Sequence, residues 1–409
     1  MAIKSVKEAQ RIIRRCIKTA VYEKIQLTES SGRILANKLS ASFPQPRFNN
    51  SAMDGFAVRA ADTKGASKKN PVDLKMVGVV SAGSLGDVVV GPGQCAQCMT
   101  GALIPEGADA IVMVEGSSGY ESGPEVQMYT EVQEGQHIRR VGEEIQSGKV
   151  LINDGSRITT AELGTLATFG YKDVRVYRKP RLAIFSTGDE LVEPGNDLLP
   201  GQIYNSNLYV FEDLVRHAGA EVTLKIVIRD DQASLKTFLT DAFYSCDMII
   251  SSGGVSMGRF DYVRDVLMEL NVMEHFWRVA QKPGKPLFFG SREKALIFGL
   301  PGNPVSAFIG FMEYVWPVLE IMSGQSRSST LSAVLDESFP CEKEKTRYLF
   351  GNTWSENGQL ICAPSKKVGS HMLTSSLKAN CIIIAEPGDK SLTKGAQIRV
   401  HLLPWKTIK

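Results

Sequence analysis

Hydrophobic positions recur with different periods along the first half of the chain. Residues 5–40 are predicted to be mainly helical, because four of their apolar residues have the spacing of one helix face: Val6, Ile12, Ile13 and Ile17. Between residues 44 and 142 the apolar runs are short and β-branched, and glycine and proline are frequent, which predicts a small β-rich domain. Residues 159–171 return to a helical pattern and are expected to pack against the first helices.

Strand-like and helix-like patterns alternate after Pro180. The strand-like runs are residues 182–185, 222–228, 248–250 and 296–298, and the helical runs are residues 207–217, 233–244, 262–270 and 304–322. This alternation predicts βαβ units in a doubly wound, mostly parallel sheet. After Gln325 the helical pattern stops, and two strand-like runs joined through Asn357-Gly358 predict a hairpin in a C-terminal β-barrel-like domain.

These patterns predict a multidomain α/β plus β protein. The expected parts are a discontinuous, mainly helical domain at residues 1–43 and 143–179, a β-rich domain at 44–142, an α/β domain at 180–326 and a β-domain at 327–409. A chain of 409 residues is long enough for two to four such domains.

The composition of the chain limits the kinds of binding partner and the cellular compartment that can be expected for it. The 47 basic and 44 acidic residues nearly balance, so nucleic-acid binding is not expected. The most apolar run, residues 308–322, contains Glu313, Pro317 and Glu320, and is predicted to be a buried helix rather than a membrane span. The N-terminus lacks a secretory signal pattern, and the scattered cysteines are predicted to be reduced thiols, which indicates a cytoplasmic protein.

Three strand-like runs of the α/β region end in glycine turns, at residues 186–190, 251–254 and 299–302. Ligands of open parallel sheets bind outside the carboxyl ends of the strands, and glycine allows them to approach the backbone closely. The same region carries four acids that could bind Mg²⁺ or cap helices: Asp189, Glu190, Asp230 and Asp261. Neither a dinucleotide-binding nor a P-loop glycine pattern is present.

Residues 281–306 contain a candidate site for an anion. Lys282 and Lys285 lie in a turn rich in proline and glycine, and Asn303 followed by Pro304 is typical of a helix start. The free N–H groups of a helix start and two ammonium groups suit an oxyanion or a phosphate. A purely structural turn explains the same residues equally well.

Six motifs in this order resemble one known family. They are NSAMDG (50–55), MTGA (99–102), STGDEL (186–191), SSGGVS (251–256), KPGKP (282–286) and GLPGNPVS (299–306). The chain resembles the molybdopterin molybdenumtransferases of the MoeA and gephyrin E-domain type over nearly its full length.

The resemblance implies insertion of molybdate into adenylylated molybdopterin, which releases AMP and the molybdenum cofactor. It further implies a need for Mg²⁺ or another divalent metal, and a homodimer of four-domain subunits. A molybdopterin adenylyltransferase is the implied supplier of the pterin substrate, and the third domain is implied to share that enzyme's fold.

The family's roles carry over to matching positions of this chain. The implied molybdate-binding residues are Lys282, Lys285, Pro286, Ser306, Arg347 and Ser370. The implied catalytic residues are Asp54, Asp230, Asp261, Lys282 and Lys285, and the implied metal ligands are Glu190, Asp230 and Asp261. The implied substrate-binding residues are Thr100, Thr187, Gly188, Asp189, Glu190, Gly253, Gly254, Ser256, Arg278, Pro301, Asn303 and Pro304. Asp54 and Thr100 are implied to reach the partner subunit's site.

Two positions depart from the family pattern, and two other functions stay open. Glu144 stands where the family usually has aspartate, and Arg278 where some relatives have lysine. The α/β domain could also serve a nucleotide or pterin pyrophosphohydrolase, or the chain could be a gephyrin-like binding scaffold. Lys282, Lys285 and Asp261 argue against a purely structural role, because a scaffold has no need of them.

Overall fold

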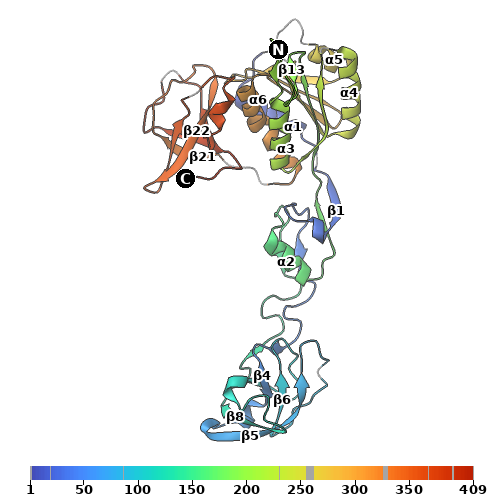
Figure 1. Ribbon diagram of the computed structural model, residues 1–409, viewed down its shortest axis with the longest axis vertical. Coiled ribbons are helices and arrows are strands. Elements are labelled where there is room, and N and C mark those ends of the chain that lie inside the picture. The colour runs from blue at the N-terminus through green and yellow to red at the C-terminus, as the bar shows by residue number, and fades with distance from the viewer. Residues whose placement is uncertain are drawn as a thin grey trace. The chain divides into compact units, whose positions relative to one another are not determined.

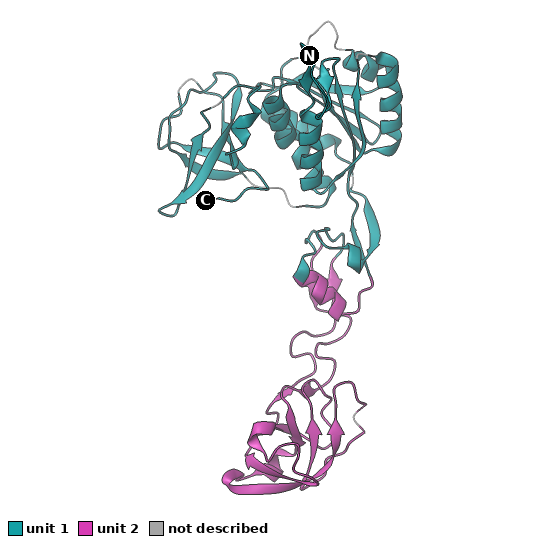
Figure 2. Ribbon diagram, in the orientation of Figure 1, with its two compact units in different colours: residues 1–37, 155–160, 173–409 teal, residues 38–154, 161–172 magenta. Residues whose placement is uncertain are grey.

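The computed structural model describes residues 2–18, 20–85, 87–229, 231–254, 262–325, 330–366, 368–388 and 391–408. Figure 1 labels their helices and strands, and Figure 2 colours the chain's two compact units. Unit 1 consists of residues 1–37, 155–160 and 173–409, and unit 2 of residues 38–154 and 161–172.

Unit 1 contains the predicted α/β sheet. In sheet order its strands are β15 (Glu221–Ile228), β12 (Arg181–Thr187), β16 (Met248–Ser252), β20 (Ala295–Leu300), β19 (Pro286–Arg292) and β17 (Met273–Arg278). The first four are mutually parallel, whereas β19 is antiparallel to both β20 and β17. The prediction of a mostly parallel sheet is therefore confirmed.

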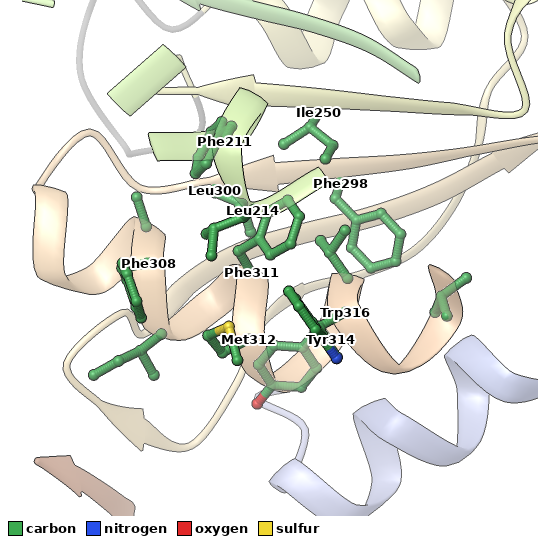
Figure 3. Packing of buried hydrophobic residues seen from close by; sticks show 14 of the residues in the cluster. Phe211, Leu214, Ile250, Phe298, Leu300, Phe308, Phe311, Met312, Tyr314 and Trp316 are labelled. Atoms are coloured by element: carbon green, nitrogen blue, oxygen red, sulfur yellow. The ribbon is translucent and has the colours of Figure 1, made fainter. Parts of the chain in front are cut away.

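Helices cover both faces of this sheet. One face packs with α3 (Asn207–His217) and with a continuous helix made of α6 (Pro304–Gly310), the π-helical segment η4 (Phe311–Val315) and α7 (Trp316–Met322). The other face packs with α4 (Gln232–Ser245) and α5 (Val263–Glu269). Side chains alternate between the two cores, as in β12, where Ile184 enters the first and Phe185 the second. Figure 3 shows aromatic and aliphatic side chains of the first core.

The helix from Pro304 to Met322 has the length and apolar composition of a membrane span, but 83% of its 18-residue window is buried in the protein. It is the core helix that the sequence predicted, because its side chains pack between the sheet and the neighbouring elements.

The N-terminal helix is shorter than predicted, and it packs against the α/β domain instead of forming part of a separate helical domain. Helix α1 (Val6–Cys16) buries Ala9 and Ile13 in the α/β core rather than in a separate helical domain. The chain then forms β1 (Tyr22–Gln26), which pairs antiparallel with β11 (Asp173–Tyr177). The expectation of helix throughout residues 5–40 was wrong, since Tyr22–Gln26 alternates between exposed and half-buried positions, as a strand does.

A closed five-stranded barrel follows the α/β domain. Its strands are β21 (Leu331–Leu335), β22 (Thr346–Glu356), β23 (Gln359–Pro364), β24 (Cys381–Ala385) and β25 (Gln397–Leu402). The predicted hairpin is confirmed: Asn357 and Gly358 both have positive φ, as a two-residue type I′ turn requires. The barrel shares its core with the α/β domain, because Phe308 of α6 packs edge-on against Phe350 of β22 with ring centroids 5.1 Å apart.

Unit 2 is built on a five-stranded sheet, as its β-rich pattern indicated. In sheet order the strands are β7 (Ala110–Met113), β4 (Gly55–Val58), β6 (Gln94–Cys98), β5 (Ser67–Val80) and β8 (Glu125–Thr130). Further short strands are β2 (Leu39–Ser40), β3 (Asn50–Ser51), β9 (Ile138–Arg139) and β10 (Val150–Ile152), and α2 spans Thr160–Thr168. Cys95 and Cys98 enter different cores of this unit, and burial raises the pKa of these thiols to about 12 and about 11.

Candidate functional site

A cleft of about 1020 Å³ lies in unit 1 at the carboxyl ends of the parallel strands β12, β16 and β20. Its walls also include the turn after β18 (Gln281–Lys282), the start of α6, and residues of β22 and of the 368–371 loop. This is where an open α/β sheet binds its ligand. The volume is at the upper end of the range of small-molecule sites.

A glycine allows the loop after β16 to lie against the end of β12. Gly254, in the loop after β16, has a φ of +69°, and a Cβ atom there would lie 2.3 Å from Cγ2 of Val263. It would also lie 2.9 Å from Oγ1 of Thr187, the last residue of β12. Only glycine fits this position, so the two loops can lie in contact at the cleft.

Asn207, at the first turn of α3, joins two of the cleft's loops. Its Nδ2 donates to Oγ of Ser252 at 2.7 Å and to the carbonyl oxygen of Gly302 at 2.8 Å. The side chain is buried, so these bonds hold the end of β16 and the loop after β20 at a set separation. Asn207 was not predicted as a site residue; the polar run 205–207 at the start of a predicted helix was the available signal.

Two cations come from segments that are distant in sequence. Strand β18 pairs in parallel with β22 so that Lys282 lies opposite Arg347. Arg347 donates from Nη1 to the carbonyl oxygen of Pro340 at 2.6 Å, while Lys282 donates to Oε1 of Glu342 at 2.6 Å. The hydrogen bond from Lys282, followed by the charges of Lys282, Arg347 and Lys345, lowers the pKa of Glu342. Lys282 and Arg347 therefore bring two cations to this wall of the cleft, with Glu342 paired to the first.

The helix start meets the barrel at Ser370. Helix α6 begins at Pro304 with Asn303 at the N-cap position, as predicted, but the Asn303 side chain forms no capping bond. It donates from Nδ2 to Oγ of Ser370 at 3.3 Å, and the N–H group of Val305 donates to the carbonyl oxygen of Ser370 at 3.0 Å. The barrel loop thus satisfies part of the helix start and places a hydroxyl beside it.

The structure brings most of the predicted site residues of unit 1 to this cleft. Those that line it are Thr187, Glu190, Gly253, Gly254, Lys282, Pro286, Pro301, Asn303, Pro304, Ser306, Arg347 and Ser370. Gly188, Asp189, Arg278 and Lys285 are not among its lining residues, and Lys285 is exposed. Asp230, Ser256 and Asp261 lie outside the described residues. His371, interpreted from the sequence as a turn residue, also lines the cleft.

Asp54 and Thr100 contact each other within unit 2. Both the backbone N–H group and the hydroxyl of Thr100 donate to Oδ1 of Asp54, at 2.7 Å and 2.9 Å. These two bonds, the backbone one first, lower the pKa of Asp54, so the carboxylate stays ionised.

The described residues contain no cluster of three or more histidine, cysteine or acidic side chains able to hold a metal. Of the predicted metal ligands, Glu190 lies at the cleft, and the two aspartates fall outside the described part of the chain. A carboxylate is an oxygen ligand of the kind that Mg²⁺ binds.

Comparison with known families gives three matches that cover most of the chain. Residues 4–170 match the MoeA N-terminal region (domain I and II), residues 183–321 a probable molybdopterin binding domain, and residues 332–403 the MoeA C-terminal region (domain IV).

Relatives and a solved structure agree with these matches. The chain is 34% identical to molybdopterin molybdenumtransferase of Bacillus subtilis, over 98% of this chain and 96% of that protein. It is 37% identical to molybdopterin molybdenumtransferase 2 of Mycobacterium tuberculosis, over 81% of this chain and 84% of that one. The crystal structure of the molybdopterin biosynthesis MoeA protein from Pyrococcus horikoshii superimposes with a TM-score of 0.83 at 30% identity, covering 98% of this chain and 99% of that one.

The parallel sheet with its cleft, the closed barrel and the β-rich unit define a multidomain enzyme of molybdenum cofactor biosynthesis. The chain belongs to the MoeA family of molybdopterin molybdenumtransferases.

Proposed function

We propose that this chain inserts molybdate into adenylylated molybdopterin, releasing AMP and the molybdenum cofactor. The observation that carries the proposal is the cleft itself, where the cations Lys282 and Arg347 adjoin polar loops at the ends of parallel strands. Molybdate is a tetrahedral dianion, and charged donors can replace the water that it loses on binding.

The molybdate end of the cleft is the wall between the Lys282 turn and the barrel. Lys282, Arg347, Ser306 and Ser370 supply ammonium, guanidinium and hydroxyl groups there. The pterin and its adenylate occupy the remaining volume, against Thr187, Asn207 and the 252–254 loop, whose hydroxyl, amide and N–H groups suit phosphate and ring-edge recognition.

A divalent metal is proposed near Glu190, with Asp230 and Asp261 completing its ligands. When bound, it would neutralise charge on the phosphoanhydride as AMP departs. The residues that line the cleft bind the substrates, orient them and exclude water.

A homodimer is proposed, with Asp54 and Thr100 of one subunit completing the cleft of the partner subunit. Ionised Asp54, held in place by its two bonds from Thr100, can accept hydrogen bonds from a substrate. A cytoplasmic location and supply by a molybdopterin adenylyltransferase complete the proposal, since adenylylated molybdopterin must be made before it is consumed.

The direct test incubates the purified chain with adenylylated molybdopterin and Mg²⁺, with and without molybdate, and follows AMP. We expect AMP release to depend on molybdate and to be lost when the metal is chelated. Equal AMP release without molybdate would instead indicate a pyrophosphohydrolase, and absence of turnover with intact substrate binding would favour a scaffold.

The ion pair between Lys282 and Glu342 gives a second prediction. Glu342 competes with an incoming anion for Lys282, so Glu342→Gln is expected to lower the molybdate concentration at half-saturation about two- to fivefold. The gain should shrink as salt is raised, because both side chains reach solvent.

Titration of molybdate against cofactor formation measures this change. Glu344→Gln is the matched control, since Glu344 is an exposed glutamate of the same segment outside the cleft lining. A Glu342→Gln protein with unchanged or weaker molybdate saturation would contradict a role for Lys282 at the anion.

A further inference from the structure

Gln281 is a buried glutamine that directly precedes the Lys282–Lys285 turn. Its side chain is 1% exposed and is not part of the cleft lining. Nε2 donates to two carbonyl oxygens of the turn, those of Pro283 at 3.2 Å and of Gly284 at 3.0 Å. Oε1 accepts a hydrogen bond from the hydroxyl of Tyr314. The amide is therefore bonded at both ends.

Tyr314 sets the orientation of this amide. It lies on the π-helical segment η4 and is 1% exposed, and its hydroxyl lies at the edge of the aromatic cluster (Figure 3). Burial, followed by the charge of Glu313, raises its pKa well above the usual range, so the hydroxyl keeps its proton. Because the turn offers two carbonyl acceptors and Tyr314 offers a donor, only one orientation of the amide satisfies all these bonds.

The amide also sets the direction of two peptide groups. The C=O and N–H groups of a trans peptide point to opposite sides. Since the carbonyls of Pro283 and Gly284 point to Gln281, the N–H groups of Gly284 and Lys285 point away from it. Neither N–H group donates a backbone hydrogen bond within the part of the chain that the structure describes. Pro283 and Gly284 line the cleft, so the N–H group of Gly284 belongs to a lining residue, and the N–H group of Lys285 is the next one along the chain.

Gly284 permits this arrangement. Its φ of +88° is in the left-handed region, and a Cβ atom there would lie 2.9 Å from Nε2 of Gln281. The turn and the amide therefore fit each other closely, and a side chain at position 284 would disturb both bonds.

We propose that Gln281, held by Tyr314, is a positioning residue for the oxyanion end of the cleft. It turns two carbonyl oxygens inward, where they cannot repel a dianion, and leaves two successive N–H groups to bind it beside Lys282. Successive N–H groups of this kind form concave anion sites in proteins. The inference rests on the proposed function, because it takes molybdate as the anion of this cleft.

Gln281→Met is the test, because methionine is of similar length and can neither donate to the two carbonyls nor accept from Tyr314. Calorimetric titration of the full chain with molybdate is expected to show about tenfold weaker binding, because the change removes three hydrogen bonds and leaves two carbonyl oxygens of the turn without a donor. Binding of adenylylated molybdopterin is expected to change less than about twofold, because its other contacts are elsewhere in the cleft.

Gln127→Met is the matched control, since Gln127 of unit 2 also accepts a hydrogen bond from a tyrosine hydroxyl, that of Tyr129 at 3.2 Å. It is expected to leave molybdate binding unchanged. If Gln281→Met does not accumulate as folded protein, Tyr314→Phe replaces it, with an expected loss of about threefold from one hydrogen bond.

The outcomes separate this inference from the proposed function. A wild-type protein that binds no molybdate would overturn the proposed function. Wild-type binding with unchanged affinity in Gln281→Met would overturn only the inference, as would equal losses of molybdate and pterin binding, which indicate a general distortion of the cleft.

Discussion

Phe308→Ala is expected to lower the free energy of unfolding of unit 1 by about 3–5 kcal/mol. Phe308 is buried where α6 meets the barrel, with ring centroids 5.1 Å from Phe350 and 6.0 Å from Trp405. Truncation leaves a cavity between two parts of the chain that share one core, and the close packing around it limits its collapse.

Urea denaturation followed by tryptophan fluorescence measures this loss. The signal reports on unit 1 alone, because the four tryptophans of the chain, Trp277, Trp316, Trp354 and Trp405, all belong to it. Tyr244→Ala is the control, since that aromatic side chain on α4 is 90% exposed and should cost less than about 0.5 kcal/mol. A loss in Phe308→Ala as small as that of the control would contradict a shared core.

Lys282→Met is expected to raise the molybdate concentration at half-saturation about ten- to hundredfold. The change removes one charge and its hydrogen bonds at a site where charge-assisted bonds contribute about 1.5–3 kcal/mol each. It also leaves Glu342 without its cation beside the site, which adds repulsion. Cofactor formation should therefore fail at low molybdate and recover as molybdate is raised.

Lys285→Met provides the comparison, because Lys285 belongs to the same turn and is exposed like Lys282, but does not line the cleft. We expect a shift of less than about threefold, since a charge outside the cleft lining acts on the anion through solvent rather than by direct contact. Titration of molybdate with each protein measures the two half-saturation concentrations and shows which lysine contributes more to molybdate binding. A larger effect at Lys285 than at Lys282 would place the molybdate pocket on the other side of the turn.

Much of the α/β domain could be predicted from its hydrophobic pattern. Its strands are buried on both faces and appear as continuous apolar runs, whereas its helices are buried on one face and show helical spacing. The pattern predicted residues 207–217 as a helix, and α3 has these bounds. Strands β17 and β19, at one end of the sheet, were not predicted; they form an antiparallel pair whose register shifts twice, so neither keeps a simple period of two. The helix predicted over residues 5–40 was too long, because a few apolar residues at helical spacing do not exclude a strand soon afterwards. The division into four domains stays a prediction.

The candidate site was only partly predictable. Glycine turns, lysines and a helix start are local features, and they pointed to the correct strand ends. Asn207 and Gln281 were not identified, because each acts through hydrogen bonds to loops or helices that the sequence places elsewhere.

The sequence of this chain alone determined which segments form helices and which form strands, and which side chains follow their ends. Helices and strands are recognised from the spacing of apolar residues that are close together in the sequence. The opposition of Lys282 and Arg347 was decided by the pairing of β18 with the barrel. The orientation of Gln281 was likewise decided by Tyr314 on a distant helix. Such contacts depend on which apolar surfaces bury one another, and that choice is made by packing across the whole of unit 1 rather than by any segment alone.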